Sequence, residues 1–290
     1  MSVTVFDYRN SILGEGPLWH PSRKQLFWFD IIGKKLLSRI ENTELEWQFD
    51  EHVSAAGWID HDSLLIASET GLWHFAIPTG ERELIVPLEA DNPITRSNDG
   101  RADRQGGFWI GTMGKNAEPN AGAIYRFFKG ELVMLFDNIT IPNSICFSPN
   151  GDRAYFACTR TQKIMQVLLD PDGWPIGELQ VFVDLAPDDL YPDGSIVDTD
   201  GCVLNAQWGE GRVARYSPNG TLIEIYPVAG IHSSCPAFGG HDFHTIFVTS
   251  ACEGLDEPSM DQGRTYQISI NNQGMAEPAV KLLVPISHRP

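Results

Sequence analysis

Positive charge is scarce in this sequence of 290 residues. Lys and Arg number 21 against 38 Asp and Glu, which gives a formal net charge of −17 at pH 7. Nucleic-acid phosphates require a basic surface, so the composition argues against a nucleic-acid partner. The acidic balance suits a protein that binds a cation or a neutral small molecule, although acidity alone establishes neither.

Long apolar segments and paired cysteines are also absent. No apolar run approaches the roughly 20 residues that a membrane-spanning helix needs, so we expect no membrane partner. The first ten residues, MSVTVFDYRN, lack the charged-then-apolar pattern of a signal peptide. The five cysteines are odd in number and include no Cys-x-x-Cys pair, which predicts small buried thiols in a reducing cytoplasm.

A third absence is helical periodicity, because Gly or Pro interrupts almost every window in which apolar residues could recur at helical spacing. What recurs instead is a unit made of a short apolar run, a polar turn, a second apolar run and one or two further strands. Successive units begin 40 to 50 residues apart, a period typical of propeller blades. The six units begin at Glu15, Ala55, Asn98, Asn143, Asp193 and Cys235. Further strands are expected at residues 36–40, 71–77, 123–128, 163–169, 212–216 and 265–270. The sequence therefore predicts an all-β fold, a six-bladed β-propeller that forms a single domain over residues 1–290.

The stretch from Arg96 to Met113, RSNDGRADRQGGFWIGTM, joins a polar cluster to a strand. We interpret the cluster as a segment that turns at Gly100 and is followed by a compact strand at 108–113. Bulky residues after a Gly-Gly turn favour a pleated strand over a helix. The cluster is therefore expected at the mouth of a strand, with Asp99 holding a turn or a neighbouring backbone amide.

Four polar residues stand at equivalent positions of their repeats, so we expect them to converge on one mouth of the central channel. They are Glu15, Asn98, Asn143 and Asp193. Carboxylate and amide oxygens are the ligands that a hard divalent cation prefers, which predicts a metal site at that mouth. Taken singly, Glu15 also fits a solvated carboxylate, and Asn143 and Asp193 also fit turn residues. Arg96 offers a fork of donors to an oxygen-rich ligand, its alternative role being an exposed salt bridge.

Other catalytic motifs are missing. No Gly-x-Ser-x-Gly sequence occurs, so the chain gives little support to a serine hydrolase and favours metal-assisted polarisation instead. His241 and His244 fall in an expected turn of the sixth unit, where a solvated loop is the simpler interpretation.

Short motifs in four of the units carry a resemblance to a known family. They are Gly14-Glu15-Gly16-Pro17-Leu18-Trp19, Asn98-Asp99-Gly100 with Gly111-Thr112-Met113, Pro142-Asn143 with Ser148-Pro149-Asn150-Gly151, and Pro192-Asp193-Gly194 with Trp208-Gly209. In this order they resemble the senescence-marker-protein/gluconolactonase family, which includes regucalcin, luciferin-regenerating enzyme-like proteins and bacterial sugar lactonases. The resemblance extends over essentially the full chain. It implies a six-bladed propeller, one divalent metal ion (Ca²⁺, Mg²⁺, Mn²⁺ or Zn²⁺) and hydrolysis of aldonolactones to open sugar acids.

The resemblance also implies roles for individual residues. Glu15, Asn143 and Asp193 would be the metal ligands. Arg96 and Asn98 would contact the substrate, with Asn98 close to the metal as well. Asp193 is in addition the candidate catalytic residue, because a carboxylate at the metal can act as the general base toward a water molecule.

The leading hypothesis is therefore a cytoplasmic sugar lactonase of carbohydrate catabolism, monomeric or weakly homo-oligomeric, with a small-molecule sugar lactone as its partner. One alternative is a calcium-binding regulatory protein of the regucalcin type that uses the same residues without turnover. Another is a hydrolase of non-sugar esters or lactones, which should have a more apolar channel rim. A third is an interaction scaffold, which should have apolar or aromatic rim loops.

Overall fold

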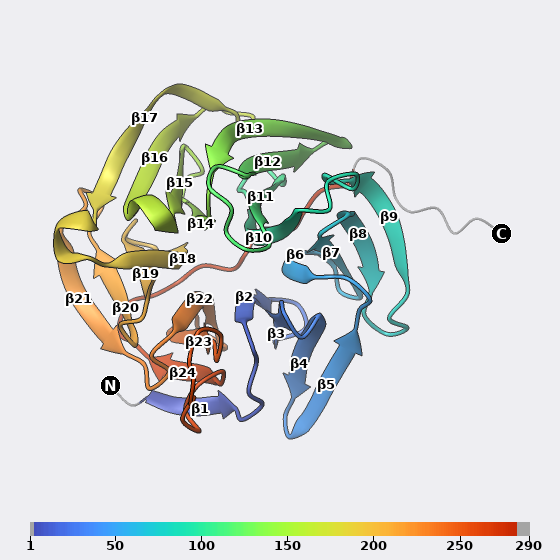
Figure 1. Ribbon diagram of the computed structural model, residues 1–290, viewed down its shortest axis with the longest axis horizontal. Helices are drawn as coiled ribbons and strands as arrows, with labels where there is room; N and C mark the ends of the chain where they lie inside the picture. The colour runs from blue at the N-terminus through green and yellow to red at the C-terminus, as the bar shows by residue number, and fades with distance from the viewer. Residues whose placement is uncertain (1–2, 283–290) are drawn as a thin grey trace.

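Six four-stranded antiparallel sheets surround a central axis in the computed structural model of the protein (Figure 1). The structure describes residues 3–282, so residues 1–2 and 283–290 of the predicted domain lie outside it. Within the described range the helical segments are two 3₁₀ turns, Thr159–Thr161 (η1) and Ala186–Asp188 (η2). No helix in that range is long and apolar enough to cross a membrane. The predicted all-β, six-bladed propeller is confirmed.

The two strands of each blade nearest the axis are almost entirely buried, which explains their continuous apolar and small-residue sequences. The innermost strands are β2 (Gly14–His20), β6 (Val53–Asp60), β10 (Thr95–Ala102), β14 (Pro142–Phe147), β18 (Tyr191–Val197) and β22 (Ser233–Gly239). The second strands are β3 (Gln25–Asp30), β7 (Ser63–Ser68), β11 (Phe108–Gly114), β15 (Arg153–Cys158), β19 (Val203–Trp208) and β23 (Thr245–Ser250).

The strands farther from the axis are in general less buried, and most residues of several outermost strands are exposed to solvent. The third strands are β4 (Lys35–Ile40), β8 (Gly71–Ala76), β12 (Gly122–Phe128), β16 (Lys163–Leu169), β20 (Arg212–Tyr216) and β24 (Thr265–Ser269). They match the further strands expected from the sequence. The outermost strands are β5 (Thr43–Gln48), β9 (Arg82–Pro87), β13 (Glu131–Ile139), β17 (Pro175–Asp184), β21 (Leu222–Pro227) and β1 (Val3–Asp7).

The N-terminal strand closes the ring. β1 pairs antiparallel with β24, with Val3 opposite Ile268 and Val5 opposite Tyr266, so the last blade contains both early and late segments of the chain. Between blades the contacts are largely apolar and aromatic. Trp109 of blade 3, for example, packs edge-on against Phe147 of blade 4 with ring centroids 5.3 Å apart. This pairing of β1 with β24 closes the ring of blades, so the apolar faces of the first and last blades are both covered.

The predicted turn at Gly100 is wrong. Arg96, Asn98, Asp99 and Gly100 all lie within β10, the innermost strand of blade 3, and the predicted strand at 108–113 is its second strand, β11. Gly100 serves close packing between these strands, because a Cβ there would lie 2.8 Å from the carbonyl oxygen of Trp109. The polar cluster is therefore buried in the channel wall and does not form an exposed segment before the strand.

The predicted buried thiols are confirmed for three of the five cysteines. All five are free; Cys146, Cys202 and Cys235 are buried, whereas Cys158 and Cys252 are partly exposed.

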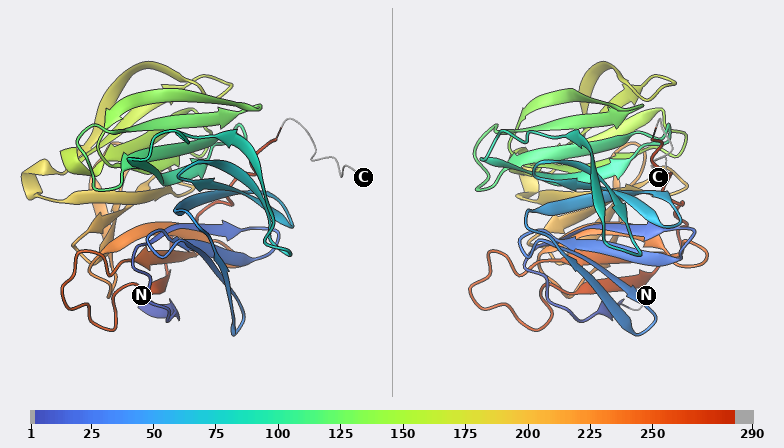
Figure 2. Two further views of the ribbon diagram at one scale, coloured as in Figure 1. Left: turned by 45° about the vertical axis from the view of Figure 1, so that its right-hand side comes forward. Right: turned by 90° about the vertical axis from the view of Figure 1, so that its right-hand side faces the viewer.

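Residues 271–282, which we call the C-terminal strap, cross the face of the propeller where the innermost strands end. Backbone hydrogen bonds attach the strap to blades 5, 6, 2 and 3; they run from Thr199 N to Gln273 O, Gly274 N to Phe243 O, Val280 N to Trp58 O and Lys281 N to Gly106 O. Figure 2 shows the strap on one face and the long loop between β23 and β24 projecting from the other. The strap therefore covers one end of the channel and leaves access from the opposite face.

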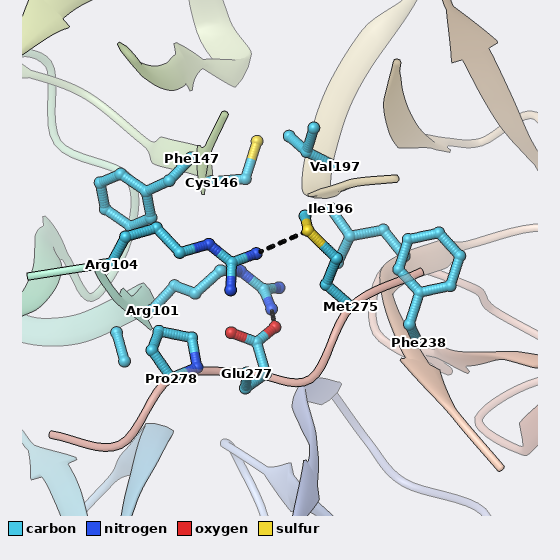
Figure 3. A pocket seen from close by; sticks show the side chains of 11 residues that line it. Arg101, Arg104, Cys146, Phe147, Ile196, Val197, Phe238, Met275, Glu277 and Pro278 are labelled. Atoms are coloured by element: carbon cyan, nitrogen blue, oxygen red, sulfur yellow. Dashed lines mark hydrogen bonds and ion pairs between the residues drawn. The ribbon is translucent and has the colours of Figure 1, made fainter. Parts of the chain in front are cut away.

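An ion pair fixes the middle of the strap to the channel wall. The Arg101 guanidinium on β10 contacts the Glu277 carboxylate (Figure 3). The Arg101 Nε also donates a hydrogen bond to the carbonyl oxygen of Ile145 at 3.1 Å. The side chains of Arg101 and Glu277 are 9% and 15% exposed. A charge this buried depends on its partner, because neither group can be rehydrated without displacing the strap.

We expect replacement of Glu277 by Ala to lower the free energy of unfolding by about 3 kcal/mol, since it leaves the Arg101 charge buried and unpaired. Urea denaturation measures the change. The control is Glu257→Ala, in an exposed loop, which should change stability by less than about 0.5 kcal/mol. Arg101→Met combined with Glu277→Met should be more stable than Glu277→Ala. Equal stability of Glu277→Ala and the control would mean that the ion pair contributes nothing.

Candidate functional site

Each innermost strand breaks its pairing with the second strand at a similar height. The register shifts lie between Glu15 and Leu18, Val53 and Ala55, Ser97 and Gly100, Asn143 and Cys146, Pro192 and Ser195, and Ser233 and Pro236. Such bulges interrupt the strict alternation of side chains between the two faces of a strand and change the direction in which the side chains point. In this protein they allow consecutive residues of one strand to face the channel.

The bulges show that the predicted metal and substrate residues do not share a single position in the repeat. Glu15 and Asn143 are the last paired residues before their bulges, whereas Asn98 and Asp193 are the first residues inside theirs. The equivalence inferred from sequence is therefore off by one residue for two of the four. All four nevertheless line one pocket, because the bulges turn both positions toward the axis.

The two asparagines form a connected pair. Asn98 Nδ2 donates to Asn143 Oδ1 at 2.8 Å and to the carbonyl oxygen of Pro142 at 2.9 Å. Asn143 Nδ2 in turn donates to Thr159 Oγ1 at 2.7 Å, and the Thr159 hydroxyl donates to the carbonyl oxygen of Pro192 at 2.7 Å. These bonds fix both amide orientations and leave each Oδ1 with a lone pair for a further partner.

The two carboxyl groups form the second half of the site. Glu15 and Asp193 are 7% and 5% exposed, and they lie close enough for each carboxyl group to affect the pKa of the other. Burial and the nearby charge of Asp99 raise the pKa of Glu15 to about 8. Burial and the charge of Glu15 raise the pKa of Asp193 well above its usual range. Arg96 is near enough to lower the pKa of Glu15, but neither carboxyl group forms an ion pair with another of residues 3–282, so the site has negative charge available for a cation.

Gly16 makes this arrangement possible. Its backbone has φ +53°, and its amide donates to Glu15 Oε2 at 2.9 Å. A Cβ at this position would lie 2.2 Å from the carbonyl oxygen of Ser54 on the neighbouring blade. Only glycine fits both the dihedral angle and the close approach of the two innermost strands.

Arg96 lies beside Asn98 with an unsatisfied donor. Its Nη1 donates to Asn98 Oδ1 at 2.8 Å and to the carbonyl oxygen of Ser97 at 2.9 Å. The residue is 5% exposed, and its Nε is buried without a hydrogen-bond partner among residues 3–282. The exposed salt bridge considered as an alternative is therefore absent from the described part of the chain. A buried orphan donor in a pocket wall indicates a site that a ligand completes.

Asp99 lies deeper in the channel and has a structural partner. Its Oδ2 accepts a hydrogen bond from the Ile145 backbone amide at 2.7 Å, as expected from the sequence. Burial raises the pKa of Asp99 to about 6. Asp99 adds negative charge beneath Glu15 and Asp193 and strengthens the preference of the site for a cation.

A pocket of about 520 Å³ contains all five residues predicted for the site: Glu15, Arg96, Asn98, Asn143 and Asp193. Sequence reasoning missed its rim, which is formed by loops and strand ends. Rim residues include Lys115, Arg160, Tyr191, Trp208 and Glu253. Nothing in the repeat pattern marked them, because the loops differ in length and sequence from blade to blade.

The donor set fits a hard divalent cation. Glu15 and Asp193 supply carboxylate oxygens and Asn98 and Asn143 supply amide oxygens, the chemistry that Ca²⁺, Mg²⁺ and Mn²⁺ favour. Over residues 3–282 no cluster of three or more His, Cys, Asp and Glu side chains is placed to hold a metal. Any cation here would therefore depend on the amides as well as the carboxylates.

Known proteins resemble this chain over nearly its full length. Residues 13–252 match the family described as SMP-30/Gluconolactonase/LRE-like region. A candidate sugar lactone lactonase of Rhizobium meliloti (strain 1021) is 37% identical over 94% of this chain and 95% of its own length. The L-arabinolactonase of Azospirillum brasilense is 34% identical over 95% of this chain and 94% of its own. A solved structure of a calcium-binding protein, regucalcin, from Agrobacterium tumefaciens superposes with a TM-score of 0.94, at 40% identity over 97% of this chain and 98% of that one.

We expect Asp193→Asn to raise the free energy of unfolding by about 1–2 kcal/mol at pH 7.5 in the presence of a chelator, because it replaces a buried carboxyl group, whose ionisation burial and the charge of Glu15 oppose, by a neutral amide. Urea denaturation is the measurement. Asp137→Asn, on the exposed side of β13, is the matched control and should be neutral. A loss of stability in Asp193→Asn would show that the carboxyl pair is not under electrostatic strain.

Proposed function

Because the chain belongs to the SMP-30/gluconolactonase/LRE-like family, we propose that it hydrolyses the ring ester of a sugar lactone to the open hydroxy acid in carbohydrate catabolism. The protein is a hydrolase that acts on carboxylic ester bonds. The observation that carries the proposal is the convergence of two buried carboxyl groups, two amides and an unsatisfied arginine donor on one pocket. Residues 1–290 would act as a single domain.

The proposed cofactor is one divalent cation held by Glu15, Asn143 and Asp193, with Asn98 beside it. The raised pKa values of both carboxyl groups support this assignment, because a bound cation would stabilise their charged forms in the buried pocket. Ca²⁺, Mg²⁺, Mn²⁺ and Zn²⁺ are the candidates. When bound, such an ion would supply Lewis-acid polarisation of the lactone carbonyl or lower the pKa of a water molecule.

Asp193 is the proposed general base. It would take a proton from the water molecule that attacks the carbonyl carbon, and the proton would pass to the ring oxygen as the carbon–oxygen ester bond breaks. The overall change adds one water molecule and yields one hydroxyl and one carboxyl group. The position of Asp193 inside a bulge supports this role, because its carboxyl group lines the pocket while Pro192 and Ser195, on either side of the bulge, stay paired with the second strand.

Arg96 and Asn98 are the proposed substrate contacts. The buried Nε of Arg96 lacks a partner among the described residues, and a hydroxyl or carbonyl oxygen of the substrate would satisfy it. The bond from Arg96 Nη1 to Asn98 Oδ1 holds the two side chains together, so they would orient the substrate as one unit.

A second candidate function is calcium-dependent regulation without turnover. The similarity to the protein described as calcium-binding regucalcin favours it, and the same four oxygen donors would serve. The other enzymatic alternative is a hydrolase of non-sugar esters or lactones, which should have a more apolar rim; the pocket wall combines acidic and amide residues with apolar ones such as Leu13, Met113 and Trp208. The substrate partner would be a small-molecule sugar lactone, and the enzyme would work as a cytoplasmic monomer or weak homo-oligomer.

The first test is acid release from a panel of glucono-, galactono-, xylono- and arabinolactones by the purified protein. Hydrolysis should be lost after chelation and return when a single divalent metal is added, because the carboxyl groups need the cation to remain charged together. Inactivity on every lactone, together with tight calcium binding, would favour the regulatory function.

Substitutions in the site separate chemistry from binding. Asp193→Ala should lower kcat by about 10²-fold or more, as expected for loss of a general base. Arg96→Ala should mainly raise KM, since the lost contact exists in the ground state as well. The exposed control Asp137→Asn should match wild type in steady-state kinetics. Undiminished turnover in Asp193→Ala, with metal affinity measured in parallel, would refute the assigned base.

A further inference from the structure

The pocket rim carries two cations, Lys115 and Arg160, that the hydrolysis described above does not use. The chain has a net charge of −17, yet in this pocket the positive side chains Arg96, Lys115 and Arg160 equal the negative ones, Glu15, Asp193 and Glu253, in number. The two rim cations come from neighbouring blades: Lys115 follows β11 of blade 3, and Arg160 lies in η1 between β15 and β16 of blade 4.

A network behind the pocket wall positions the Lys115 ammonium. Its Nζ lies 3.1 Å from Glu69 Oε2 and donates to the carbonyl oxygen of Pro93 at 3.1 Å. Glu69 is itself only 20% exposed and contacts His52 Nδ1 at 2.6 Å. An ammonium group has three donors. Two are used by the network, and one is left for a ligand in the pocket.

Arg160 is positioned by its neighbour. Thr159, directly before it, bridges Asn143 and the carbonyl oxygen of Pro192, so this end of η1 is tied to the base of the site. The Arg160 side chain is exposed and forms no hydrogen bond or ion pair with any of residues 3–282. Its planar fork is therefore available to a ligand, and such a fork matches a carboxylate well.

Glu253, the acidic residue on the same rim, does not cancel these charges. It lies near enough to Arg96 to act electrostatically on that buried guanidinium, which already requires a negative partner. The negative side chains of the pocket thus serve the proposed cation and Arg96, whereas Lys115 and Arg160 line the pocket without an acidic partner among its lining residues.

We propose that Lys115 and Arg160 select lactones that carry a carboxylate at the end of the carbon chain remote from the lactone carbonyl, that is, aldarolactones. The inference rests on the proposed lactonase function and narrows its substrate class. The hydrolysis is unchanged: one water molecule is added, the ring ester bond breaks, and the product is a hydroxy-dicarboxylic acid. The reaction that supplies such a substrate must oxidise either the terminal hydroxymethyl carbon of a sugar acid or the anomeric carbon of a uronic acid, which becomes the lactone carbonyl.

The test compares an aldono-1,4-lactone with the aldaro-1,4-lactone of the same configuration, which differ in a terminal hydroxymethyl group against a carboxylate. The wild type should show a kcat/KM at least tenfold higher for the aldarolactone at low ionic strength. The advantage should shrink in 0.5 M NaCl, because the two rim cations are partly exposed and are screened by salt. A merely structural role for the cations would give no such salt dependence.

Four variants tie the preference to these side chains. Lys115→Gln and Arg160→Gln should each reduce the aldarolactone advantage several-fold, and the double variant should abolish it. Lys115→Arg, which keeps the charge, should retain most of it. The control is Lys129→Gln, which removes one positive charge from the exposed turn after β12, at the opposite end of blade 3; it should retain the full preference.

Equal rates on both lactones, or a preference that survives in the Lys115→Gln/Arg160→Gln variant, would overturn the inference while leaving the lactonase function standing. Hydrolysis of neither lactone would refute the lactonase function instead. In that case calorimetry decides the role of the rim. At least tenfold tighter binding of the aldarate dianion than of the aldonate, lost in the double variant, would support a carboxylate-binding rim, and equal binding would overturn it.

Discussion

The interruption of strand pairing in the innermost strands is the constraint on which the candidate site depends. In an uninterrupted strand, successive side chains would point alternately toward the channel and into the space between blades, so only one residue in two would reach the channel. The bulges after Glu15 and Asn143, and those that contain Asn98 and Asp193, break this alternation at a similar height in four blades. Four rigid strands can then present oxygen donors to one point. The rest of each blade supports that geometry with paired backbone and buried apolar side chains.

This convergence has an electrostatic cost within the protein. Glu15, Asp193 and Asp99 are all nearly inaccessible to water, and burial raises the pKa of each carboxyl group. Fold stability alone would not select three buried acids beside one another, since apolar residues of similar size would fill the same space without repulsion. Their presence is therefore better explained by a ligand that they bind than by the fold they belong to.

The two ends of the channel are built differently. At one end the C-terminal strap, held by the Arg101–Glu277 ion pair, covers the channel with backbone hydrogen bonds to four blades. At the other end, loops from several blades leave a pocket whose base is acidic and whose rim contains Lys115 and Arg160. Substrate and water thus reach the carboxyl groups from one side. A ligand with a polar carbonyl at one end and an anion at the other would match the proposed cation site at the base and Lys115 and Arg160 at the rim.

The sequence by itself determined the number of blades, because a repeat of apolar run, turn and apolar run is readable wherever each blade buries the same two inner strands. It also identified Glu15, Arg96, Asn98, Asn143 and Asp193, since polar residues at the start of otherwise apolar strands stand out. Only the tertiary structure decided which position of each innermost strand these residues occupy. A bulge changes by one residue which side chain points to the channel, and no sequence pattern indicates it, as at Asn98 and Asp193. The same holds for β10, whose polar residues suggested an exposed turn although they line a buried channel. The Arg101–Glu277 pair and the Lys115–Glu69 contact join residues far apart in the chain, and such pairings follow from how the blades close into a ring, not from local pattern.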